Sequence, residues 1–182
     1  MVIISRIFAG AIGEAAMSNQ PDTITLERAA SSASKDATPA TTTRNELGNA
    51  GFADAGTWTV GEMRGLVMQL MANEAESFYA VQYEHPQAGA WTDVVTIYGD
   101  GTSATYTTNR PTGLNERPGH PTTNCPGMSA AQLLQKARTT RKKGVFAPHS
   151  TRKAVDDFTR AYAESIAWRK KKGVSAGEVQ KV

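Results

Sequence analysis

The sequence has very few of the residues from which metal sites and disulfides are built: one cysteine, Cys125, and three histidines among 182 residues. A single cysteine cannot form an intramolecular disulfide, so a small disulfide-stapled scaffold is excluded. The usual CxxC and HExxH zinc motifs cannot be assembled either. No apolar run reaches the roughly 18 residues that a membrane-spanning helix needs. We therefore expect neither a metal site nor a transmembrane segment.

The motifs of common enzymes are also missing. There is no GxxxxGK[ST] phosphate-binding loop, and Gly99-Asp100-Gly101-Thr102 reads as a turn between two strands. The zinc-deaminase pattern is absent. His120 and Cys125 lie five residues apart, but no third metal ligand or orienting acid accompanies them. We therefore expect a protein with no catalytic residues and no cofactor.

Bulky apolar residues are scarce between residues 17 and 56. Residues 17–56 are rich in Ala, Ser, Thr, Asn and Gly, a composition that buries too little surface to offset the entropy of ordering the chain. We expect residues 1–56 to form a disordered arm. Two interpretations stay open for residues 1–16: an amphipathic docking segment, with apolar residues at helical spacing, or residues that result from the choice of start codon.

The predicted folded part covers residues 57–172 and begins with a helix from Val60 to about Glu76. Thr59 and Glu62 fit a capping box at its start. Alternating or β-branched stretches predict three strands, the first with Tyr79, Val81 and Tyr83 on one face. These strands are Phe78–Glu84, Trp91–Tyr98 and Thr102–Thr108. Residues 109–127 then hold four prolines and three glycines, and ordered loops of this length are often functional.

Two helices close the predicted domain. Ser129 and Gln132 form a second capping box, before a helix that ends by Gly144. The last helix starts near Ser150 or Thr151 and ends at Lys172, and residues 173–182 are expected to be a flexible tail. Its apolar stripe, which is expected to dock on the sheet or on a second subunit, comprises Val155, Phe158, Tyr162 and Ile166. The predicted fold class is α+β: one small domain with a helix, a three-stranded antiparallel meander and two helices, preceded by the disordered arm.

The predicted order of helix, three strands and helix over about residues 59–143 is similar in topology to double-stranded-RNA-binding domains, which recognise A-form shape and phosphates. That family carries its basic cluster at the start of the second helix. Here the corresponding Ser129-Ala130-Ala131-Gln132 is neutral and the cations follow at the far end. The resemblance is therefore limited to topology.

Charge is divided unevenly along the chain. Residues 1–127 carry 7 Lys and Arg against 13 Asp and Glu, whereas residues 128–182 carry 13 against 4. Such an asymmetry is typical of proteins with a polyanionic partner, although cations on outer helix faces also occur without one. The predicted nucleic-acid-binding residues are these cations and one tryptophan beside them: Lys136, Arg138, Arg141, Lys142, Lys143, Arg152, Lys153, Trp168, Arg169, Lys170, Lys171 and Lys172.

From these features we predict non-enzymatic, sequence-nonspecific binding of nucleic acid through the basic C-terminal helices. The alternative is a small phage or mobile-element assembly or inhibitor protein. Its acidic and basic halves would bind an acidic protein surface or join copies of the chain into a homo-oligomer. The expected location is the cytoplasm, or a virion if the protein is of phage origin.

Overall fold

The computed structural model describes residues 20–30, 37–111, 113–173 and 178. Seven strands form one sheet in sequence order, with antiparallel neighbours except for the parallel pair β6 and β7. The strands are β1 (Leu26–Ala29), β2 (Ala53–Val60), β3 (Val67–Asn73), β4 (Phe78–His85), β5 (Gly89–Ile97), β6 (Ser103–Thr107) and β7 (Thr122–Asn124). The helices are α3 (Ala37–Asn49), α4 (Ala130–Thr140) and α5 (Ala154–Lys172).

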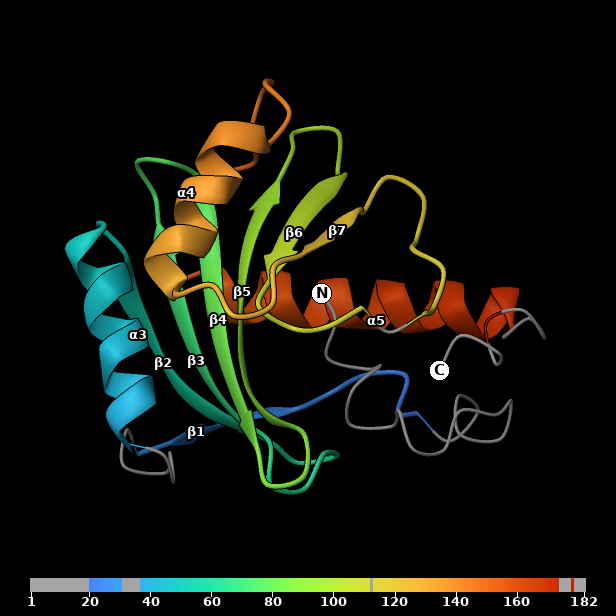
Figure 1. Ribbon diagram of the computed structural model, residues 1–182. Coiled ribbons are helices and arrows are strands. Elements are labelled where there is room, and N and C mark those ends of the chain that lie inside the picture. Colours follow the sequence, from blue (N-terminus) through green and yellow to red (C-terminus); the bar gives the residue numbers. More distant parts are fainter. Residues whose placement is uncertain (1–19, 31–36, 112, 174–177, 179–182) are drawn as a thin grey trace.

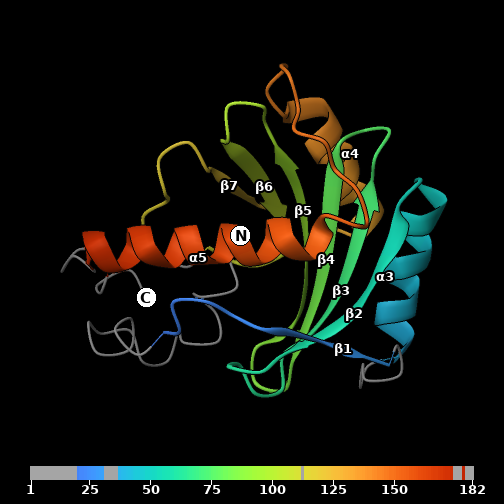
Figure 2. The same cartoon turned by 180° about the vertical axis from the view of Figure 1, so that it is seen from behind.

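Helices cover both faces of the sheet. Helices α3 and α4 lie on one face (Figure 1), and α5 crosses the other and extends beyond the edge strand β7 (Figure 2). Side chains alternate along a strand, so β4 contributes to both cores. Tyr79, Val81 and Tyr83 pack in the α5 core, as their spacing predicts, while Phe78 and Ala80 pack in the core under α4.

The predicted fold class is wrong, because the protein has a seven-stranded mixed sheet rather than a three-stranded meander. The three predicted strands are present as β4, β5 and β6 in the middle of that sheet. The helix predicted from Val60 to Glu76 is instead the end of β2, a turn and β3. Strand β3 is buried on both faces, so its apolar residues do not alternate, and Val67, Leu70 and Met71 imitate helical spacing. Gly65, with φ +85°, adopts a left-handed conformation that a helix does not allow.

Strand β1 and helix α3 lie inside the segment that was expected to be a disordered arm. The few apolar side chains of this segment are placed where they can be buried: Ile24 in the α5 core, and Leu47 and Phe52 in the α4 core. Strand β1 pairs with β2 in the sheet, which satisfies its backbone hydrogen bonds on that side. Few apolar residues are therefore enough to order residues 20–30 and 37–56, because most of each core is supplied by the rest of the chain. Residues 1–16 lie outside the described part.

Both C-terminal helices are present. The capping box is confirmed: the Ser129 side chain accepts a hydrogen bond from the Gln132 amide, and the Gln132 side chain accepts one from the Ser129 amide. Helix α5 ends at Lys172, as predicted, and Gly173 follows with φ +72°. Phe158, Tyr162 and Ile166 are buried against the sheet. The apolar stripe therefore docks on the chain's own sheet.

If this docking stabilises the domain, Phe158→Ala should lower the free energy of unfolding by about 3–5 kcal/mol, because it leaves a gap beside Tyr83 in the α5 core. The exposed Lys171→Ala should change it by less than about 0.5 kcal/mol. Urea unfolding of both variants and the wild type measures the difference. A Phe158→Ala protein as stable as the wild type would contradict a docked α5.

A candidate ligand cavity between α5 and the sheet

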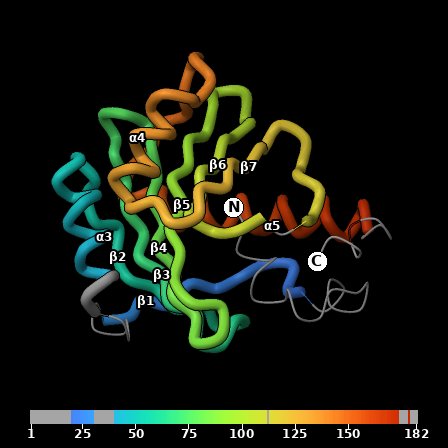
Figure 3. Tube along the Cα trace, viewed as in Figure 1, coloured from blue at the N-terminus to red at the C-terminus, as the bar shows by residue number. Residues whose placement is uncertain are grey.

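A cavity of about 600 Å³ lies between α5, strands β3 to β7 and the segment that joins β6 to β7. Helix α5 extends past the edge of the sheet, so part of its inner side has no strand beneath it (Figures 1 and 2). The segment between β6 and β7, residues 108–121, swings out from the sheet and reaches the far part of α5 (Figure 3). The cavity is therefore walled by the sheet, by α5 and by this segment.

The inner wall of the cavity is apolar and rich in aromatic rings. Strand β4 contributes Tyr79, Val81 and Tyr83, all with at most 6 % of their surface exposed. Helix α5 contributes Phe158 and Trp168. Aromatic and aliphatic walls of this kind are the usual lining of small-molecule sites.

The segment between β6 and β7 is fastened to α5 by polar contacts. The Arg117 guanidinium forms an ion pair with Glu164 of α5 at 3.1 Å. The guanidinium of Arg169 donates to the carbonyl oxygen of Asn115 and pairs with Glu178 at 2.8 Å. The Asn115 amide donates to the same Glu178 carboxylate at 2.7 Å. These contacts hold the outer wall of the cavity in place.

One neutral polar pair, Ser103 and His120, lies in the cavity wall. Ser103 Oγ of β6 is 2.9 Å from Nδ1 of His120, which precedes β7. Burial and the nearby Arg117 lower the pKa of His120, so its imidazole is neutral at pH 7. A neutral imidazole carries one donor and one acceptor nitrogen. This pair can therefore bind a polar group of a ligand without bringing a charge into the cavity.

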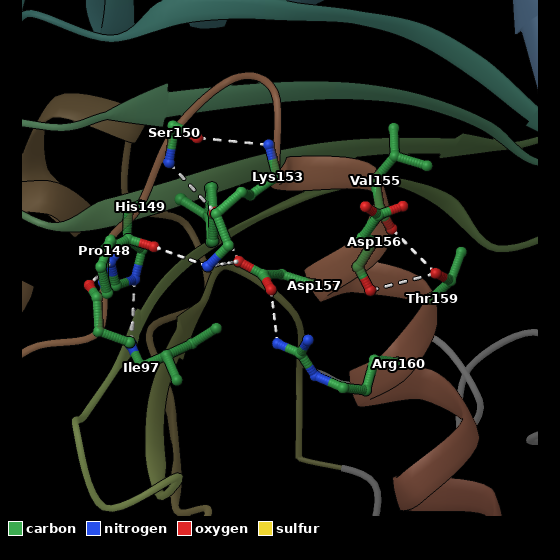
Figure 4. A network of polar contacts seen from close by, with 12 residues as sticks. Ile97, Pro148, His149, Ser150, Lys153, Val155, Asp156, Asp157, Thr159 and Arg160 are labelled. Atoms are coloured by element: carbon green, nitrogen blue, oxygen red, sulfur yellow. Dashed lines mark hydrogen bonds and ion pairs between the residues drawn. The ribbon is translucent and has the colours of Figure 1, made fainter.

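The start of α5 is fixed to the sheet by a network around Asp157 (Figure 4). Its buried carboxylate accepts a hydrogen bond from the Tyr79 hydroxyl at 2.7 Å and pairs with Arg160 at 2.5 Å and Lys153 at 3.4 Å. Burial alone would raise the pKa of Asp157, but the hydrogen bonds from Tyr79 and Arg160 and the charge of Lys153 outweigh it and lower that pKa. Asp157 therefore stays ionised while buried.

His149 lies just before α5 and is hydrogen-bonded to β5. Its Nδ1 donates to the Ala147 carbonyl at 2.6 Å, and its Nε2 accepts from the Ile97 amide at 3.1 Å. Both bonds together require the neutral ring. Burial lowers the pKa of His149, which agrees with these partners. His149 thus has a structural role, because both ring nitrogens are engaged by the backbone.

Three of the predicted nucleic-acid-binding residues form contacts around α4 or line the cavity. Arg138 forms a two-point pair with Glu76 at 2.7 and 2.5 Å. Arg141 lies between the rings of Phe78 and Phe146, at 4.0 and 4.2 Å. Trp168 lines the cavity.

Four more of these residues have partners around α5. Lys153 pairs with Asp157, and Arg169 and Lys172 both approach Glu178. Lys170 pairs with Asp22 at 2.7 Å. Arg169 is only 8 % exposed and contacts the outer cavity wall, so its guanidinium is not open to a nucleic-acid partner. These cations therefore have partners within the fold.

The remaining five predicted residues are not gathered on one helix face. Lys142 lies over the Tyr98 ring at 5.8 Å. Within the described residues, the side chains of the other four make no hydrogen bond or ion pair: Lys136, Lys143, Arg152 and Lys171. The basic residues of α4 and α5 lie on helices that cover opposite faces of the sheet (Figures 1 and 2). The two basic helices thus do not form one common face.

Comparison with protein-family models, curated proteins and solved structures finds no match to this chain. Over the described residues, no helix is long and apolar enough to cross a membrane, and no three His, Cys, Asp or Glu side chains are grouped to hold a metal ion. The sequence drew attention to residues 109–127 through their prolines and glycines, and part of this segment forms the outer cavity wall. Sequence reasoning missed the pairing of Ser103 with His120, because it depends on the parallel pairing of β6 with β7.

The network before and at the start of α5 predicts acid sensitivity. An unfolded histidine binds a proton near pH 6.5, whereas the folded protein keeps His149 neutral to lower pH. Below pH 6.5 the unfolded state therefore binds more protons, and stability should fall as the pH decreases. Asp157 adds a further loss below about pH 3.8, since its folded pKa is also lowered. Between pH 7.5 and 5.5, urea unfolding should show a smaller decrease in the free energy of unfolding for His149→Gln than for the wild type. His85→Gln, at the last residue of β4, is the control. An equal decrease in His149→Gln would contradict the assignment.

Proposed function

We propose that this protein is a non-enzymatic binding protein that holds a small, mostly apolar molecule in the cavity between α5 and the sheet. The observation that carries the proposal is the cavity itself: about 600 Å³, with an apolar aromatic inner wall. Small-molecule sites typically measure 300–1,000 Å³ and combine apolar walls with a few polar groups. The cavity has both properties.

The apolar wall of this solvent-open cavity is costly to leave in contact with water. The chain nevertheless keeps this space open, and the ion pair between Arg117 and Glu164 joins its outer wall to α5. A bound apolar molecule would remove this wall from water, which supports a ligand-binding role.

Nucleic-acid binding through the basic C-terminal helices stays a prediction with less geometric support. Phosphate contacts need cations that share one surface and are free to reach the backbone. Here α4 and α5 lie on opposite faces of the sheet, and Arg138, Arg141 and Arg169 are engaged within the fold. The residues of the cavity wall converge on one place, so the cavity is better supported as a binding site than the basic helices.

Binding of a protein partner also has less support. Protein interfaces need a contiguous patch with an apolar centre. The large apolar side chains that are exposed in the described part are Met128 and Val145. Apolar side chains of β4 and α5 converge on the cavity instead.

A neutral, apolar fluorescent dye, N-phenyl-1-naphthylamine, tests the proposal. It should bind the wild type at one site with a rise in fluorescence. Ala161→Phe places a ring in the cavity from α5 and should weaken binding about tenfold or more, because it takes apolar volume from the dye. Ala167→Phe adds the same ring at an exposed position of α5 and is the matched control.

The outcome depends on both variants remaining folded, which circular dichroism checks. Unchanged binding to Ala161→Phe, or equal losses in the two variants, would place the dye elsewhere. No dye binding to the wild type would contradict the proposed function.

A further inference from the structure

The charged groups of the cavity wall neutralise one another. The wall has three arginines, Arg117, Arg160 and Arg169, and three carboxylates, Glu116, Asp157 and Glu164. Arg117 pairs with Glu164 and Arg160 pairs with Asp157, and a further carboxylate, Glu178, pairs with Arg169.

The remaining wall carboxylate also has a partner. The Glu116 carboxylate accepts a hydrogen bond from the Thr122 amide at 2.7 Å. The wall carries equal numbers of arginines and carboxylates, so an ionised ligand that enters loses hydration without meeting an excess of opposite charge. The charges of the wall therefore disfavour both anions and cations.

The Ser103–His120 pair provides a neutral alternative. The backbone fixes it: the Ser103 amide donates to the Gly119 carbonyl and the His120 amide donates to the Arg117 carbonyl, both at 3.0 Å. Nδ1 of His120 is occupied by Ser103, and within the described residues Nε2 has no hydrogen-bond partner. The one remaining ring nitrogen of this fixed pair is available to a ligand.

The pair can act as donor or as acceptor. If the Ser103 hydroxyl donates to Nδ1, then Nε2 of His120 carries the proton and donates to a ligand carbonyl or hydroxyl oxygen. If Nδ1 donates to Ser103, Nε2 is free to accept from a ligand hydroxyl. Both arrangements suit an uncharged oxygen group.

We propose that the cavity selects uncharged molecules that have an apolar body and a hydroxyl or carbonyl group, which hydrogen-bonds to Nε2 of His120. The apolar body lies against Tyr79, Val81 and Phe158. This inference rests on the proposed function, and it adds the chemical class of the ligand and the residue that recognises its polar end.

Displacement of N-phenyl-1-naphthylamine by four ligands with the same carbon chain tests the class: 1-decanol, 2-decanone, decanoate and decylammonium at pH 7. The alcohol and the ketone should displace the dye at about tenfold lower concentration than the two ions, because an ion loses hydration without meeting an excess of opposite charge in the wall. If an ion binds as well as the alcohol, the proposed selectivity is wrong.

Variants of the pair test the recognising residue. His120→Ala should weaken 1-decanol binding about fivefold relative to the dye affinity of the same variant, the effect of one net hydrogen bond. Ser103→Ala should also weaken it, whereas Ser103→Thr keeps the hydroxyl and should retain it. His85→Ala, outside the cavity wall, is the control.

The outcomes separate this inference from the proposed function. Dye binding with no preference among the four ligands, or unchanged 1-decanol binding to His120→Ala, overturns the inference and leaves the ligand cavity standing. The absence of dye binding overturns both. Selective binding that depends on His120 and on the Ser103 hydroxyl supports both.

Discussion

The buried carboxylate of Asp157 is the contact on which the arrangement of α5 depends. It sits in the first turn of α5, where a negative charge is favoured by the helix dipole. The hydroxyl of Tyr79, from the middle of the sheet, donates to it, and Lys153 and Arg160 balance its charge. A buried carboxylate that lost these partners would be strongly destabilising. The position of α5 over β4 is thereby fixed at one end.

The cavity follows from this fixed start. Helix α5 packs on the sheet through Phe158, Tyr162 and Ile166 and then continues past the edge strand. The segment between β6 and β7 closes the space that this leaves, and ion pairs of Arg117 and Arg169 hold it there. Cations that appear in the sequence as a basic run therefore partly serve to build the wall of a cavity, with their charge cancelled by carboxylates.

Residue spacing and turn residues predicted several individual helices and strands. They did not predict which segments far apart in the sequence pair or pack together. The capping box at Ser129, the end of α5 at Lys172 and the strands β4 to β6 follow from spacing and turn residues. Strand β3 was misread as helix because burial on both faces removes the alternation that marks a strand. Strand β1 and α3 were missed because their stability comes from partners far along the chain. For the same reason the sequence indicated the segment around His120 but not its partner Ser103.

The most direct test of the account is to locate the bound molecule by two-dimensional amide NMR during titration with a neutral apolar probe. The account predicts shifts confined to the cavity wall: the β6–β7 segment around Asn115, the Ser103 and Thr105 amides of β6, and the Trp168 indole of α5. Amides of α4, on the other side of the sheet, should not move. Shifts centred on α4, or none at all at saturating probe, would contradict a ligand cavity under α5.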